Sequence, residues 1–95
     1  MEKTPGRRRV RASADPAKEA VEVAARMVRR AGRLAGQGDP EHLAQLLELH
    51  RLLDEVVQEA VDTQRAGGIT WQSIGDATGT TRQAALMKWA PKKTA

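Results

Sequence analysis

Asp-Pro pairs and glycines divide this chain into separate helical segments, and no other feature restricts its fold as strongly. Asp15-Pro16 and Asp39-Pro40 each place an acid directly before a proline. An acid at the N-cap accepts backbone N–H bonds, and proline suits the first helical position because its missing N–H needs no partner there. Glycines mark the opposite ends. The expected helices are residues 16–35, closed by Gly36-Gln37-Gly38, and residues 40–66, closed by Gly67-Gly68.

The last third of the chain is interrupted more often. Thr70 and Thr80-Thr81 provide hydroxyl groups suited to N-caps, Gly79 breaks the pattern, and Pro91 ends it. Short helices are therefore expected over residues 71–78 and 82–89. No alternating run of β-branched residues predicts a strand. The fold class indicated by the sequence is all-α.

The 16–35 segment has an apolar face and an arginine face. Because residues three and four apart lie on one side of a helix, the two sets fall on opposite sides. The arginine face is open to three interpretations: a solvated surface, a phosphate contact, or a partner for acidic residues of another copy. The apolar face holds Ala17, Ala20, Val21, Ala24, Met27, Val28, Ala31 and Leu34, and the arginine face holds Arg26, Arg29, Arg30 and Arg33.

The 40–66 segment is apolar over more than half of its circumference, so it needs neighbours on two sides. The 16–35 helix can cover one side as an antiparallel hairpin, which makes residues 15–66 a support. The C-terminal module or a second copy must cover the other, and we expect a homodimer through the Leu43–Val61 helix. The apolar positions are Leu43, Leu46, Leu47, Leu49, Leu52, Leu53, Val56, Val57, Ala60 and Val61, and an acidic ridge is formed by Glu41, Glu48, Glu55 and Asp62.

Charge is unevenly distributed along the chain. The whole chain has 16 basic and 12 acidic residues, for a net charge of +4. Residues 1–14 hold five basic side chains and one acid with almost nothing apolar, which predicts a disordered basic arm. Residues 39–66 carry seven acids against two bases, and residues 67–95 carry four bases against one acid. The basic ends favour contact with nucleic acid there.

Residues 67–95 satisfy the requirements of a helix-turn-helix, in which two short helices pack across a glycine-containing turn. Ile74, Ala85 and Trp89 are expected to face the core, while Gly75 permits close crossing and Gly79 supplies the turn conformation. The outward positions of the last helix are then Thr81, Arg82, Gln83, Leu86 and Met87, with Lys88 at the edge.

Residues 70–89 also resemble the helix-turn-helix of bacterial DNA-binding proteins, in the style of sigma-factor region 4 and of small actinobacterial regulators. The shared pattern is S-W-x-x-I-G-x-x-x-G-[VIT]-[ST]-R-Q-A-A-x-x-[KR]-[WF]. The resemblance implies that the 82–89 helix enters a major groove, and it does not extend to residues 16–66. The matching residues are Thr70-Trp71, Ile74-Gly75, Gly79, Thr81-Arg82-Gln83-Ala84-Ala85 and Lys88-Trp89, and the departures are Thr78 and Thr80, where an apolar residue is usual.

General chemistry gives similar roles to these side chains. Arg82 can bond guanine O6 and N7, and Gln83 can bond adenine N6 and N7. Threonines at the helix start and nearby lysines suit phosphates, and apolar side chains suit a thymine methyl group. The expected DNA contacts are Thr80, Thr81, Arg82, Gln83, Leu86, Met87, Lys88, Lys92 and Lys93, with Arg7, Arg8 and Arg9 of the arm as minor-groove or phosphate contacts.

Other classes of function receive little support. Cysteine is absent, which removes disulfides, zinc–thiolate sites and thiol catalysis. His42 and His50 lie eight residues apart, a poor spacing for a helical metal site. No catalytic Ser/His/Asp arrangement, phosphate-binding glycine loop or membrane segment stands out, so we expect a cytoplasmic, nucleoid-associated regulator of transcription, or a plasmid, phage or chromosome factor, that is not an enzyme and needs no cofactor. The competing hypothesis is a protein-interaction module that docks on RNA polymerase or another helical partner.

Overall fold

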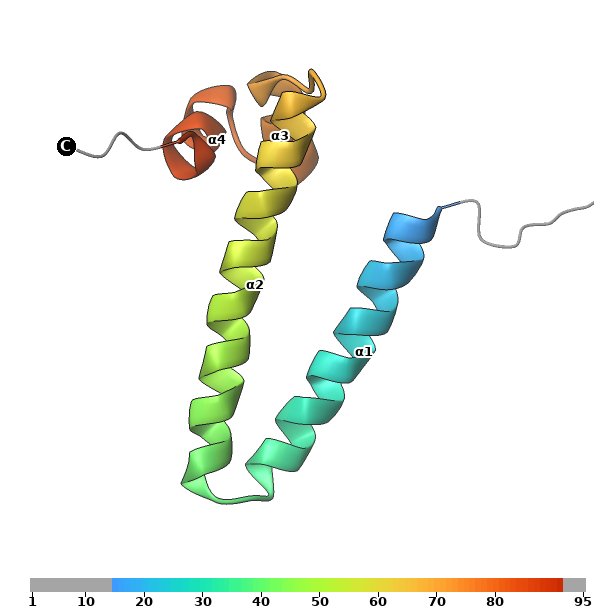
Figure 1. Cartoon of the computed structure of the whole chain (residues 1–95), viewed down its shortest axis with the longest axis vertical. Coiled ribbons are helices and arrows are strands. Elements are labelled where there is room, and N and C mark those ends of the chain that lie inside the picture. Colours follow the sequence, from blue (N-terminus) through green and yellow to red (C-terminus); the bar gives the residue numbers. More distant parts are fainter. Residues whose placement is uncertain (1–14, 92–95) are drawn as a thin grey trace, which may run out of the picture. The chain divides into compact units, whose positions relative to one another are not determined.

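A computed structural model describes residues 15–91, and this part of the chain is built from helices without a strand (Figure 1). The all-α prediction is confirmed. The expected helix boundaries agree with the observed ones to within one residue. The helices are α1 (Pro16–Gly36), α2 (Pro40–Ala66), α3 (Trp71–Thr78) and α4 (Arg82–Trp89).

Side chains cap three of the four helix starts as the sequence predicts. Oδ1 of Asp15 accepts the Lys18 N–H at 2.9 Å, Thr70 Oγ1 accepts the Ser73 N–H at 3.1 Å, and Thr81 Oγ1 accepts the Ala84 N–H at 3.0 Å. Each bond satisfies a donor that the first helical turn leaves unpaired.

The start of α2 differs from the Asp15 start. There the backbone N–H of Asp39 donates to Nδ1 of His42 at 2.9 Å, so the residue at the third helical position reaches back to the cap. This is the side-chain-to-backbone half of a capping box, with an imidazole in place of a carboxylate. The repeated Asp-Pro pair therefore starts both long helices, but with different hydrogen bonds.

Two glycines with positive φ end α2 and α3 in the same way. Gly68 has φ +99°, and the N–H of Ile69 donates to the carbonyl of Gln64 at 3.0 Å. Gly79 has φ +75°, and the N–H of Thr80 donates to the carbonyl of Gly75 at 2.8 Å. These are Schellman motifs, in which a left-handed residue lets the chain reverse over the last helical turn.

The chain divides into two compact units, Met1–Leu47 and Glu48–Ala95, and the division falls within α2. The C-terminal unit therefore includes residues 48–66 of α2 in addition to the expected 67–95 module. In the N-terminal unit α1 contains no buried residue, and its apolar face is exposed at Val21, Met27 and Leu34. The antiparallel hairpin stays a prediction, because the apolar face of α1 is not covered.

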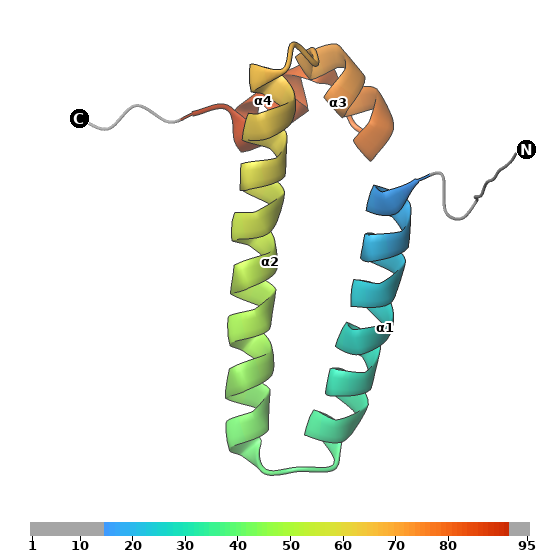
Figure 2. The ribbon, with the colours of Figure 1, turned by 45° about the vertical axis from the view of Figure 1, so that its right-hand side comes forward.

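The core lies in the C-terminal unit, where α3 and α4 lie side by side at the end of α2 (Figure 2). The core consists of Val61, Trp71, Ile74 and Ala85, whose side chains are 8%, 9%, 4% and 0% exposed, respectively. Trp89 packs against this cluster from α4. The expected inward positions of α3 and α4 are confirmed, and the core is small because it rests on four buried side chains.

None of the helices within residues 15–91 is long and apolar enough to cross a membrane. The basic arm at residues 1–14, including Arg7, Arg8 and Arg9, lies outside the described residues, as do Lys92 and Lys93.

Candidate nucleic-acid interface

The crossing of α3 and α4 depends on the absence of a side chain at Gly75. A Cβ on this residue would lie 2.8 Å from the carbonyl carbon and oxygen of Thr81 and 3.1 Å from the nitrogen of Arg82. The backbone at the start of α4 therefore packs directly on the backbone of α3. This close approach fixes where the first turn of α4 points, as the sequence predicted for this glycine.

The first turn of α4 is open to solvent. Thr80, Thr81, Arg82 and Gln83 are all exposed, whereas Ala85, two residues after Gln83, is fully buried. The hydroxyl oxygen of Thr81 accepts the N–H of Ala84, which leaves its O–H available to donate outward. The turn thus presents a hydroxyl, a guanidinium and an amide on one surface.

The second turn of α4 is only partly as expected. Met87 and Lys88 are exposed, and the Lys88 ammonium lies 5.2 Å from the ring centroid of Trp89. Leu86, by contrast, is half-buried and packs against the core cluster. The outward placement of Leu86 was wrong, because Leu86 lies three residues before Trp89 and therefore on the same face of α4, the face that packs against the core cluster.

Two side chains of α2 anchor this module, and sequence reasoning missed both. Nε2 of Gln58 donates to the carbonyl of Trp89 at 2.8 Å, which satisfies an acceptor in the last turn of α4. Nη1 of Arg65 donates to the carbonyl of Ile69 at 2.9 Å, and its guanidinium carbon lies 4.9 Å from the ring centroid of Trp71. A basic residue in the last turn of a helix can bond the carbonyl groups there, so the position of Arg65 in α2 could have indicated its role. No local feature of the sequence indicated the role of Gln58.

Thr78, a departure from the family pattern, satisfies its own polar group. Its hydroxyl donates to the carbonyl of Ile74 at 2.8 Å within α3. The threonine thus occupies a usually apolar position without leaving an unpaired donor.

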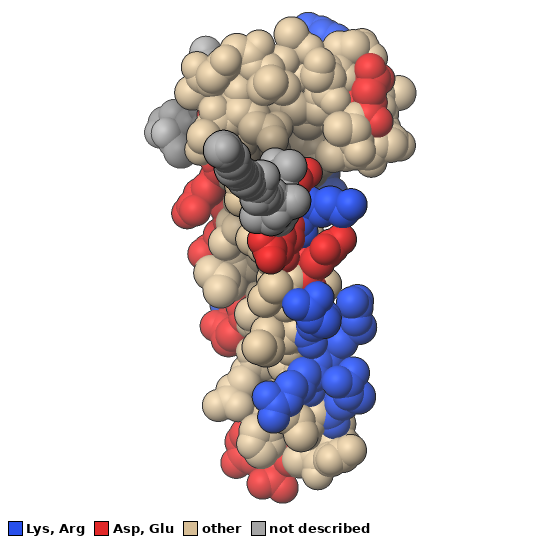
Figure 3. Space-filling model, turned by 90° about the vertical axis from the view of Figure 1, so that its right-hand side faces the viewer, with Lys and Arg blue, Asp and Glu red and all other residues tan. Residues whose placement is uncertain are grey.

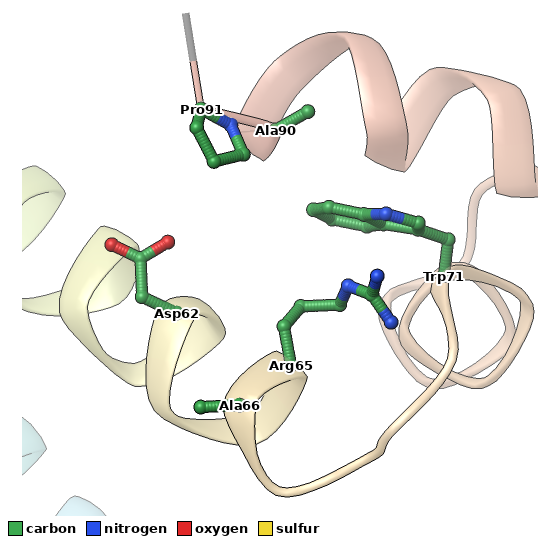
Figure 4. A pocket seen from close by; sticks show the side chains of 6 residues that line it. All are labelled: Asp62, Arg65, Ala66, Trp71, Ala90 and Pro91. Atoms are coloured by element: carbon green, nitrogen blue, oxygen red, sulfur yellow. The ribbon is translucent and has the colours of Figure 1, made fainter.

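A shallow hollow of about 370 Å³ lies between α2 and the ends of this module (Figure 4). The guanidinium of Arg65 lies close to the indole of Trp71 at its edge, and Asp62 reaches toward it from α2. Ala90 and Pro91 close the far side. Since these two residues follow α4, the hollow lies at the opposite end of that helix from Arg82. Within residues 15–91, His, Cys, Asp and Glu side chains form no group of three that could hold a metal ion.

Comparison of the chain with protein-family models, curated proteins and solved structures finds no match. The resemblance of residues 70–89 to bacterial helix-turn-helix proteins therefore stays a hypothesis, and the function must be inferred from the geometry.

Proposed function

We propose that this chain binds double-stranded DNA and places α4 in the major groove. The observation that carries the proposal is the exposed first turn of α4. Arg82 and Gln83 are exposed there, while Ala85, which follows them in the same helix, is fully buried in the core. In helix-turn-helix proteins the residues at the start of the second helix contact base edges.

The proposed roles follow from the groups that the first turn presents. Arg82 bonds a guanine and Gln83 an adenine, because each can form two parallel hydrogen bonds in the major groove. Thr80, Thr81 and Lys88 bind phosphates, and Met87 contacts a thymine methyl group. Leu86 is no longer among the proposed DNA contacts, because it packs on the core. On the sequence pattern alone, Lys92, Lys93, Arg7, Arg8 and Arg9 remain among them as further phosphate contacts.

A protein of this kind regulates transcription or maintains a plasmid, phage genome or chromosome, and it acts at the nucleoid by binding rather than by catalysis. The resemblance to sigma-factor region 4 and to small actinobacterial regulators supports this role.

Arg82→Ala is expected to reduce sequence preference, whereas Lys88→Ala weakens binding to all duplexes alike. A good bidentate base contact contributes about 1–3 kcal/mol of discrimination, and a phosphate contact carries no sequence information. Sites selected from a random oligonucleotide pool provide the preferred duplex, and fluorescence anisotropy over a salt series compares it with a scrambled one. If the wild-type chain binds no duplex at low salt, the proposal is wrong and a protein-docking role takes its place.

We also propose that a second copy of the chain covers the apolar face of α2. Leu53 and Val56 are 55% and 47% exposed, so the α3–α4 core, which contacts α2 through Val61, does not cover them. A dimer would present two copies of α4 to two half-sites, which compensates for the few base pairs that one short helix can contact.

Leu53→Gln is expected to raise the dimer dissociation constant at least tenfold, because burial of a leucine contributes about 1.5–3 kcal/mol. Glu55→Gln is the matched control, since it changes the exposed acidic ridge of the same helix. Sedimentation velocity over a range of micromolar concentrations measures both. A wild-type chain that stays monomeric at tens of micromolar contradicts the dimer and leaves the DNA proposal standing.

A further inference from the structure

We infer that the arginine face of α1 is a second DNA-binding surface, which holds the phosphate backbone of the duplex. The face consists of Arg26, Arg29, Arg30 and Arg33, all exposed on one side of the helix. Figure 3 shows the Lys and Arg side chains gathered along α1. The inference rests on the proposed function and assigns a further surface, on a different helix, to the same partner.

Three of the four arginines, Arg29, Arg30 and Arg33, have no acidic residue three or four positions away in α1. Glu22 lies four residues before Arg26, but no hydrogen bond or ion pair joins any of the four to another group within residues 15–91. Arg51 of α2 differs, since its Nη1 lies 2.7 Å from Oε1 of Glu48. Like charges three and four residues apart destabilise a helix. The arginine face is therefore repulsive until an external anion neutralises it.

The residue type and the spacing both fit phosphates. Guanidinium groups form paired hydrogen bonds with phosphate oxygens, which a lysine ammonium cannot do, and all four positions are arginine. From Arg26 to Arg33 the helix rises about 10 Å. Duplex DNA carries one negative charge per about 1.7 Å of its axis, so about six phosphate charges lie along the same length.

The acidic ridge of a second copy does not fit as the partner. On α1 the arginine face lies opposite the apolar face, and on α2 the ridge of Glu41, Glu48, Glu55 and Asp62 also lies opposite the main apolar face. A dimer that buries the apolar faces directs both charged faces toward solvent. The ridge therefore cannot neutralise the arginines in such a dimer.

A membrane surface fits less well than DNA. The apolar face of α1 contains no aromatic residue, and half of its eight positions are alanine; the others are Val21, Met27, Val28 and Leu34. Helices that lie in a bilayer interface bury bulky residues such as Trp, Phe and Leu. Small alanine side chains favour packing against another helix, which leaves the arginines on the outer side of the protein.

A salt series with the full chain tests this inference. Each phosphate contact steepens the log–log dependence of the binding constant on salt by about 0.9. Arg29→Gln is expected to reduce this slope by about 0.9, and Arg29→Gln with Arg30→Gln by about 1.8, with sequence preference unchanged. Arg51→Gln is the matched control and leaves the slope as in the wild type. Circular dichroism establishes that each variant keeps its helix content.

The outcomes separate the inference from the proposed function. If the wild type binds duplex DNA but the double variant keeps the full slope, the arginine face does not contact DNA and the inference is overturned, while the proposal for α4 stands. If the wild type binds no duplex, both fail. If the double variant keeps the DNA slope but loses binding to vesicles of phosphatidylcholine and phosphatidylserine, the face belongs to a membrane surface, which also overturns the inference.

Discussion

Trp71→Ala is expected to unfold the α3–α4 module and to abolish DNA binding with it. Trp71 is 9% exposed, and its ring contacts the core as well as the guanidinium of Arg65. Truncation of a buried tryptophan to alanine costs about 3–5 kcal/mol. The core of this unit has only four buried hydrophobic side chains among the described residues, and small domains have little stability in reserve. The loss is therefore comparable with the whole stability of the unit.

Urea titration followed by fluorescence measures the effect, because Trp89 remains as a reporter on α4 in the variant. Met87→Ala is the control, since Met87 is 69% exposed on the same helix as the reporter and a change there is expected to stay within about 0.5 kcal/mol. A Trp71→Ala variant with the unfolding midpoint of the wild type would show that the core does not depend on this ring.

The helix boundaries were predictable from the sequence because local chemistry determines them. Asp15, Thr70 and Thr81 accept N–H bonds from residues three positions ahead, and Gly68 and Gly79 adopt the positive φ that ends a helix. All of these interactions join residues close in the chain, so a sequence pattern carries them completely.

Contacts between distant residues were not predictable in the same way. The bond from Gln58 to the carbonyl of Trp89 joins residues 31 apart, and nothing around Gln58 indicates which helix end it will meet. The boundary between the compact units, at Glu48 within α2, was not predictable either, because a continuous helix shows no break in its own sequence there.

The candidate site was predictable from the sequence only in part. The exposure of Gln83 followed from helical spacing, because Gln83 lies on the opposite side of α4 from Ala85. Arg82 and Thr81 lie three and four residues before Ala85, so spacing alone does not expose them; they are exposed at the start of the helix. The error at Leu86 was avoidable, because Leu86 lies three residues before the inward-facing Trp89 and so shares its face of α4.

Gly75→Ala is expected to weaken both the α3–α4 packing and DNA binding, although alanine is the better helix former. The added Cβ would meet backbone atoms of Thr81 at 2.8 Å, and backbone cannot rotate away as the end of a long side chain can. Overpacking of this kind costs about 1–3 kcal/mol. Since the atoms that must move begin α4, the shift also displaces Arg82 and Gln83 from their positions on the surface.

A glycine-to-alanine substitution in α1 is the control, and its expected effect on stability is the opposite of that of Gly75→Ala. A Cβ on Gly32 would have no atom within 4 Å, so Gly32→Ala is expected to gain about 0.5–1 kcal/mol of helix stability. Tryptophan fluorescence follows the C-terminal unit, which contains both indoles, and far-UV circular dichroism follows the helix content of the whole chain, to which α1 contributes. If Gly75→Ala stabilises the chain as Gly32→Ala does, α3 and α4 do not pack backbone to backbone, and α4 lacks the support that its role in the groove requires.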